Sequence, residues 1–356
     1  MRESRDGTFR AARFGALTVA ALELAGCSGA EPRAGEAAGS GDAAAAQSPV
    51  ASESPVLALP PGNPFEAMSP YVYPNTWAAK AVEMLRASSP EEAALAEKIA
   101  EHPAAEWFSY PYETIGTEVD SYVSAAASAG TLPVLVPYHL PNRDCGLYSA
   151  GGAEDPQGYR DWAAAFVAAI GNRPAVVVLE PDALPQLTTC LSEPDQAQRL
   201  ELIRSFAEAL SALPSTVVYL DAGHSSWVPA NVMAERLLEA GIAGVRGFTI
   251  NVSNYQRDAD LLRYGHDLIT RLGLETHFVI DSSRNGNGPA AGPDSWCNPT
   301  GRALGREPTA DTGDAALDAY LWVKRPGESD GECAGGPAPG LWFPERAFEL
   351  ARNASW

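Results

Sequence analysis

Seven short apolar segments, each followed by an amphipathic helical pattern or a long loop, extend through the chain from residue 105 to residue 323. Segments that alternate in this way are typical of βα units whose strands are parallel. Because about seven units follow one another without a change in composition, the pattern predicts a closed parallel α/β barrel rather than an open nucleotide-binding sheet. The segments are 105–110, 132–138, 175–180, 216–222, 245–251, 276–281 and 319–323.

Charge and motifs exclude several classes of function. The 45 acidic residues outnumber the 25 Lys and Arg residues, and the resulting formal charge of -20 repels nucleic acids and anionic membrane surfaces. Neither GxGxxG nor GxxxxGK[ST] follows the early strands, and the His residues are scattered without a Cys/His cluster. We therefore expect no nucleic-acid partner, no cofactor and no metal.

The first 62 residues differ from the rest of the chain. Residues 1–27 combine a basic start with a short apolar stretch that ends in Leu-Ala-Gly-Cys, which predicts an export signal and resembles the lipobox of bacterial lipoproteins. Cys27 would then be the lipidated residue and the only link to a membrane, although Glu23 interrupts the apolar stretch and an ordinary cleaved signal is the alternative. Residues 28–62 have the composition of a flexible linker, and residues 63–356 form the predicted catalytic barrel domain.

The segment VVVLEPDAL (176–184) contains a strand that is expected to be buried on both faces, yet it ends in Glu180 and Asp182. An ionised carboxylate is costly in such a place, so either residue could merely cap the next helix or could serve as an acid with a raised pKa. The other predicted strands also end in polar groups, which in a parallel barrel meet at one rim. Converging carboxylates and aromatic residues indicate glycoside hydrolysis. These strand-end groups are Tyr110, Tyr138, Asp144, Glu180, Asp182, Asp221, Asn251, Asn254, Asp281, Lys324, Glu328 and Asp330.

Six separated motifs resemble those of glycoside hydrolase family 6, the cellulases, and within it the bacterial endoglucanases. The resemblance covers residues 63–353 and implies a distorted seven-stranded, TIM-like βα barrel that cleaves β-1,4-glucan with inversion at the anomeric carbon. The motifs are PNRDC (141–145), VLEPDAL (178–184), YLDAGHSSW (219–227), NVSNY (251–255), VIDSSRNGNGP (279–289) with WCNP (296–299), and WVKRPGESDGEC (322–333).

The resemblance also implies catalytic roles. Asp182 would be the proton donor, and Asp144 would keep that donor protonated. Asp330 would be the positional candidate for the base, with a water chain to Asp144 and Ser149 as the alternative. Tyr138 would press on the distorted sugar at the cleavage point.

Further residues would bind the glucan, because sugar rings offer apolar faces to aromatic side chains and hydroxyls to polar ones. Trp107, Trp227 and Trp296 are expected to stack on sugars, whereas Trp77, Trp162 and Trp322 are expected to pack in the core. Asp221 would bind sugar hydroxyls or tune the site. The remaining candidates for hydroxyl contacts are His224, Asn254, Lys324 and Glu328.

Cysteines and loop lengths complete the expectations. By resemblance, Cys145 pairs with Cys190 and Cys297 with Cys333, which requires an oxidising compartment and a secreted or cell-surface protein, expected to be a monomer. His139, Ser329 and the additional Glu332 depart from the family pattern. The short segments 146–158 and 331–345 predict an open cleft and internal cleavage. An exo-acting cellobiohydrolase and a non-catalytic glucan-binding lipoprotein are the alternatives.

Overall fold

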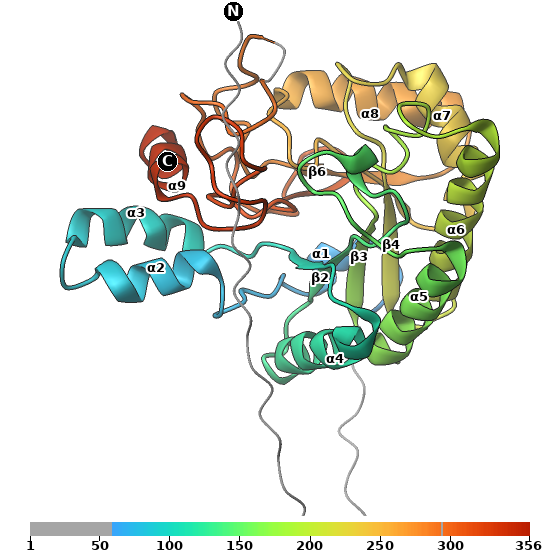
Figure 1. Ribbon diagram of the computed structural model, residues 1–356, viewed down its shortest axis with the longest axis horizontal. Coiled ribbons are helices and arrows are strands. Elements are labelled where there is room, and N and C mark those ends of the chain that lie inside the picture. The colour runs from blue at the N-terminus through green and yellow to red at the C-terminus, as the bar shows by residue number, and fades with distance from the viewer. Residues whose placement is uncertain (1–58, 293–294) are drawn as a thin grey trace, which may run out of the picture. The chain divides into compact units, whose positions relative to one another are not determined.

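The computed structural model describes residues 59–292 and 295–356 (Figure 1). The expected export signal, its Cys27 and most of the linker lie outside these residues. None of the described helices is long and apolar enough to cross a membrane. In chain order the elements are α1 (Pro64–Ala67), α2 (Trp77–Leu85), α3 (Pro90–Ala100), β1 (Glu106–Phe108), α4 (Tyr112–Ser128), β2 (Val134–Pro137), η1 (Asp144–Gly146), α5 (Pro156–Ile170), β3 (Ala175–Leu179), α6 (Glu193–Ser211), β4 (Thr216–Asp221), α7 (Ala230–Glu239), η2 (Ile242–Gly244), β5 (Gly247–Ile250), α8 (Asp258–Leu272), β6 (His277–Asp281), β7 (Leu317–Leu321) and α9 (Pro344–Asn353).

The seven strands form one curled sheet in the order β1 to β7, and each strand pairs in parallel with the next. The predicted distorted, seven-stranded, TIM-like parallel barrel is therefore confirmed, with its strands in the expected order. The described strands show no β7–β1 ladder, so hydrogen-bonded strands do not close the barrel at that point. The strand β1 spans only three residues, and the seam beside it has a single backbone bond, from Ala105 N–H to Trp322 O (2.9 Å). The indole Nε1 of Trp107 adds a second bond, to Val323 O (2.8 Å).

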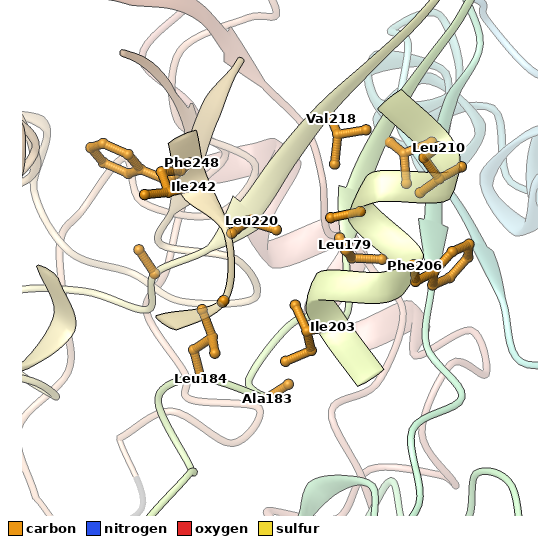
Figure 2. Packing of buried hydrophobic residues seen from close by; sticks show 14 of the residues in the cluster. Leu179, Ala183, Leu184, Ile203, Phe206, Leu210, Val218, Leu220, Ile242 and Phe248 are labelled. Atoms are coloured by element: carbon orange, nitrogen blue, oxygen red, sulfur yellow. The ribbon is translucent and has the colours of Figure 1, made fainter. Parts of the chain in front are cut away.

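The strand β3 separates two apolar layers. Val176 and Val178 belong to the cluster inside the barrel, whereas Val177 and Leu179 pack against the outer helices. This assignment follows from the two-residue repeat of a strand, which sends successive side chains to opposite faces. Figure 2 shows Leu179 near the α6 side chains, and α4 to α8 surround the strands in Figure 1. Each fully buried Val or Leu contributes about 1.5–3 kcal/mol of stability.

Two smaller packing units complete the barrel. In the first unit, the ring of Phe65 in α1 stacks on the ring of Tyr219 in β4, and the two ring centroids are 6.4 Å apart. Beside the barrel, helices α2 and α3 pack with α9 around the buried Trp322. Trp322 and Trp162 are 1% and 0% exposed, which confirms their expected core positions.

A buried ion pair holds β4 to β7 together near the end of the barrel opposite the strand carboxyl ends. Asp318 is 2% exposed and accepts two hydrogen bonds from Arg246, from Nε to Oδ2 and from Nη2 to Oδ1, both 2.7 Å long. The hydroxyl of Tyr219 donates a third bond to Asp318 (2.6 Å). Such a pair stabilises little in itself, but the loss of one partner leaves an uncompensated buried charge.

We predict that Asp318→Ala lowers the free energy of unfolding by about 3–5 kcal/mol, because Arg246 would remain buried without its carboxylate. Urea unfolding followed by tryptophan fluorescence measures the change. The matched control is Asp267→Ala, since the pair between Asp267 and Arg271 (2.8 Å) is half exposed and contributes less than about 1 kcal/mol. Equal losses in the two variants would contradict the assignment.

Candidate active site

A cleft of about 990 Å³ lies at the carboxyl ends of the strands. It is polar along its floor and aromatic at several points of its walls. The sequence motifs that contribute to it are far apart in the chain, and the parallel strands bring them together. The predicted residues that line the cleft are Trp107, Tyr138, Asp144, Ser149, Asp182, His224, Trp227, Asn254, Trp296, Lys324, Glu328 and Asp330.

Asp182 lies in the loop directly after β3 and faces the cleft. Its backbone has a left-handed φ of 69°, a conformation that is uncommon for a residue with a side chain. The backbone N–H of Asp182 donates to Asp221 Oδ2 (2.9 Å), and the hydroxyl of Tyr138 donates to Asp182 Oδ2 (3.2 Å). Both ends of the residue are therefore fixed by side chains from neighbouring strands.

Burial and, as the second cause, the negative charge of Asp144 together raise the pKa of Asp182 to about 7, although the hydrogen bond from Tyr138 acts in the opposite direction. A carboxyl group with this pKa retains a proton close to neutral pH and can donate it. In other hydrolytic sites, different environments give two carboxyl groups different pKa values, so that one acts as the acid and the other as the base.

Asp221 lies beneath the cleft, is 2% exposed and does not line it. Burial holds the pKa of Asp221 well above its usual range, and the Asp182 charge adds to the effect. Of the two roles expected from sequence, the position of Asp221 suits tuning of the site, because its carboxyl group contacts the backbone of Asp182.

Glu180, the other carboxylate after β3, has a different environment. It is 1% exposed and accepts hydrogen bonds from the backbone N–H groups of His139 (3.0 Å) and Leu140 (3.3 Å) and from the Tyr159 hydroxyl (3.0 Å). Burial raises the pKa of Glu180 to about 7, although these donors oppose the rise. Glu180 therefore ties the loop after β2 to helix α5 and does not enter the cleft.

Asp144 is fixed by two donors. Its Oδ2 accepts from the backbone N–H of Ser149 (2.9 Å), and its Oδ1 accepts from the side chain of Gln186 (3.0 Å). The adjacent Arg143 donates to Ser149 O and Tyr138 O, both at 2.7 Å, and its guanidinium lies 5.0 Å from the Tyr138 ring centroid. The loop that contains Asp144 is thus held against Tyr138.

Asp330 is buried at the cleft surface within an ion-pair cluster. Arg284 Nη1 is 2.9 Å from its Oδ2, and Lys324 Nζ is 3.7 Å from its Oδ1. The backbone N–H of Asn298 also donates to Oδ2 (3.0 Å). Burial alone would raise the pKa of Asp330, but the Arg284 and Lys324 cations bring it below its usual value. This carboxylate is therefore ionised.

Aromatic side chains lie on both sides of Asp182. On the β1 side, the Trp107 and Tyr138 rings meet edge to face with centroids 5.3 Å apart. On the β4 side, Trp227 lies 5.7 Å from the ring of His224, whose pKa burial lowers to about 4, so that it is neutral near pH 7. The exposed Trp296 stands 6.1 Å from Tyr148.

Trp77 was expected in the core, and that expectation is wrong. The side chain is 38% exposed and lines the cleft together with Lys80, whose Nζ lies 5.1 Å from the ring centroid. The reason is its position at the first residue of α2, where Ala78, Ala81 and other small residues supply the packed face. An apolar residue at a helix end does not reveal from periodicity alone which face it occupies.

Both disulfides expected by resemblance are present. Cys145 is bonded to Cys190, and Cys297 is bonded to Cys333, with Cα atoms 5.7 and 6.2 Å apart. The first links the Asp144 loop to the segment after Asp182. The second links the Trp296 loop to the segment after Asp330.

Sequence reasoning missed several residues in and beside the cleft. Arg143 lines the cleft and holds the loop that contains Asp144 against Tyr138, and Arg284 pairs with Asp330 from behind the lining. The sequence signals for them were their places next to Asp144 and within SSRNGNGP. Glu106 and Arg325 form a further buried pair (3.2 Å), and Arg325 also contacts Glu328 (3.3 Å). Among the described residues, no group of three or more His, Cys, Asp or Glu side chains is placed to hold a metal ion.

Comparisons with known proteins agree with this geometry. The chain is 45% identical over 289 residues to endoglucanase A of Thermobispora bispora, which covers 80% of this chain but only 62% of that protein. The solved endoglucanase Cel6 from Mycobacterium tuberculosis, in complex with methyl-cellobiosyl-4-deoxy-4-thio-β-D-cellobioside, is 42% identical, with a TM-score of 0.78, and the match covers 82% of this chain and 99% of that one.

A more distant relative is 1,4-beta-D-glucan cellobiohydrolase C of Emericella nidulans, at 29% identity and with 83% of this chain and 79% of that protein covered. That alignment extends over 359 residues, more than the 356 of this whole chain, so the cellobiohydrolase has insertions that this chain lacks. The model of the glycosyl hydrolases family 6 matches residues 65–354. The chain belongs to glycosyl hydrolase family 6.

Proposed function

We propose that this protein is an endo-β-1,4-glucanase that hydrolyses cellulose or soluble β-1,4-glucans with inversion of the anomeric configuration. The observation that carries the proposal is the Asp182 carboxyl group, whose pKa burial raises to about 7 and which Tyr138 and Asp221 hold in a cleft lined by aromatic residues. The endoglucanases among its relatives, one of them solved with a cello-oligosaccharide analogue, support glucan as the substrate.

In the proposed reaction, Asp182 gives its proton to the glycosidic oxygen as that bond breaks. A water molecule attacks the anomeric carbon from the opposite face and loses a proton to a carboxylate, a step that requires about 6.5–9.5 Å between the two carboxyl groups. Tyr138 would contact the sugar at the cleavage point, because its ring lies between Trp107 and the acid.

Asp330 is the positional candidate for the base, and a water chain through Asp144 and Ser149 is the second route. The ionised state of Asp330 suits a base, but its pairing with Arg284 lowers its affinity for a proton. Asp144 lies close enough to raise the pKa of Asp182, which supports its proposed role beside the acid.

Internal cleavage is favoured over release from chain ends. The segment after Asp330 is short. The alignment with the cellobiohydrolase requires insertions in that protein, because it extends over 359 residues. The alignment with the endoglucanase covers 80% of this chain in only 289 residues and requires few. Without such insertions the cleft has less chain to cover it, so that a long glucan can enter from the side. The two disulfides support export to an oxidising compartment, and lipidation of Cys27 remains part of the proposal.

We predict that the protein lowers the viscosity of carboxymethylcellulose rapidly relative to the number of reducing ends that it releases. Cuts inside a chain shorten it most per bond broken, which distinguishes this activity from a cellobiohydrolase. The first product seen by NMR should be the α-anomer, as inversion at a β-linkage requires. A slow fall in viscosity would favour exo-cleavage, and a β-anomer would contradict inversion.

The second prediction concerns the acid. Asp182→Asn should lower kcat on soluble glucan by about 10²–10⁴-fold, since the amide cannot donate the proton, and should leave glucan binding intact. Reducing-end release measures the activity and calorimetry measures the binding. The control Asp161→Asn alters an exposed residue of α5 and should retain full activity.

The activity of Asp330→Asn, measured under the same conditions, distinguishes the two candidate routes by which the attacking water loses its proton. A loss as large as that of Asp182→Asn assigns the base to Asp330, and a loss below about tenfold assigns it to the relay through Asp144. Equal release of reducing ends by wild type and Asp182→Asn would defeat the acid assignment. No release from either protein, with binding retained, would indicate the glucan-binding alternative.

The third prediction concerns pH. Because Asp182 must be protonated to act, kcat/KM should fall as the pH rises through about 7, the pKa to which burial raises this group. Asp144→Asn removes a negative charge that raises this pKa, so the alkaline limb should move to lower pH. Tyr138→Phe removes a hydrogen bond that lowers it, so the limb should move to higher pH.

The pH profile of kcat/KM on a soluble cello-oligosaccharide checks both signs. Shifts in the same direction, or an unchanged limb in both variants, would show that Asp182 does not govern the alkaline side.

A further inference from the structure

The cleft continues beyond the aromatic residues that the sequence motifs identified. Tyr138 and Trp107 line the cleft in contact with each other, and Trp77 and Lys80 of helix α2 line the same cleft. Lys80 is close enough to Glu106 for its charge to oppose the rise in pKa that burial causes in that carboxyl group. The helix α2 belongs to the packing unit beside the barrel and not to any of the βα units. None of the motifs that carry the acid or the base includes it.

Helix geometry explains why two α2 side chains face the cleft. Residues three or four positions apart lie on the same side of a helix, so Trp77 and Lys80 share one face. The adjoining face, with Ala78, Ala81 and Val82, is buried against α3 and α9, so that Trp77 and Lys80 lie at its exposed edge. The hydroxyl of Thr76 accepts a hydrogen bond from Ala79 N–H (3.2 Å) and fixes the first turn, and with it the position of Trp77.

The chemistry of this end of the cleft matches a sugar ring. Trp77 offers an exposed aromatic surface, which suits the apolar face of a pyranose, and the Lys80 ammonium stands beside it as a hydrogen-bond donor. The cleft lining also includes Glu106, whose carboxylate pairs with Arg325 (3.2 Å). Fixed polar groups beside an aromatic platform provide partners for hydroxyls.

We propose that Trp77 and Lys80 form an additional glucosyl subsite at the β1 end of the cleft, which binds a distant sugar of a long β-1,4-glucan chain. The inference rests on the proposed function for the identity of the sugar. The inference rests on the fact that Trp77, Trp107 and Tyr138 line one cleft. A glucan chain that extends from Asp182 past Trp107 would therefore meet the ring of Trp77. The subsite would favour long substrates over short ones.

The experiment measures kcat/KM of wild type and Trp77→Ala on cello-oligosaccharides of increasing length. For the shortest oligosaccharide that is cleaved, the two proteins should agree within about twofold, because productive binding holds it at Asp182. For cellohexaose the variant should lose about tenfold, mainly through a higher KM, as expected for the loss of one aromatic stacking contact. Trp77→Phe, which keeps a smaller aromatic face, should restore most of the loss.

Met84→Ala is the matched control, because Met84 is exposed on the same helix but does not line the cleft. It should behave as wild type at every length. An equal loss at all lengths would place Trp77 in the chemistry and overturn the subsite, and so would the absence of any loss with cellohexaose.

A binding measurement separates this inference from the proposed activity. Calorimetry of cellohexaose with Asp182→Asn and with the double variant Asp182→Asn/Trp77→Ala should show a Kd about tenfold higher in the latter. If that difference appears while wild type cleaves no glucan, the activity fails and the subsite stands. If wild type cleaves glucan and the two Kd values agree, the subsite fails and the activity stands.

Discussion

The end of strand β3 is the constraint on which the rest of the site depends. Glu180 and Asp182 both have left-handed backbone conformations, with φ values of 47° and 69°, and these cost free energy that the surroundings must offset. The hydrogen bonds to Glu180 from the loop after β2 and from Tyr159 hold the first residue, and the bond from Asp182 N–H to Asp221 holds the second. As a result one carboxylate is turned into the protein and the other into the cleft.

The two halves of the cleft differ in charge balance. Around Asp182, burial and the negative charge of Asp144 raise the pKa to about 7, against the opposing effect of the hydrogen bond from Tyr138. Around Asp330 the cations Arg284 and Lys324 compensate the charge, and the carboxylate stays ionised. A barrel rim with a protonated group on one side and an ionised group on the other is the arrangement that glycoside hydrolysis with inversion needs.

The N-terminal packing unit extends this site. Helices α2 and α3 pack with α9, and through Trp322 they are attached to the strand that carries Asp330 toward the cleft. The same helices place Trp77 and Lys80 at the cleft edge. Helices that pack beside the barrel thus also contribute side chains to the cleft lining, in addition to the residues that follow the strands.

The sequence by itself determined the seven parallel strands and the set of polar residues at the strand ends, because apolar periodicity is a local property of the chain. The disulfide pairs were implied by the family resemblance and not by any local pattern. Only the tertiary structure decided which carboxylate faces the cleft. Glu180 and Asp182 are two residues apart and chemically alike, and their roles differ through contacts with His139, Tyr159 and Asp221. The exposure of Trp77, the open seam of the barrel and the pairing of Arg284 with Asp330 likewise depend on segments distant in sequence, whose packing no local pattern encodes.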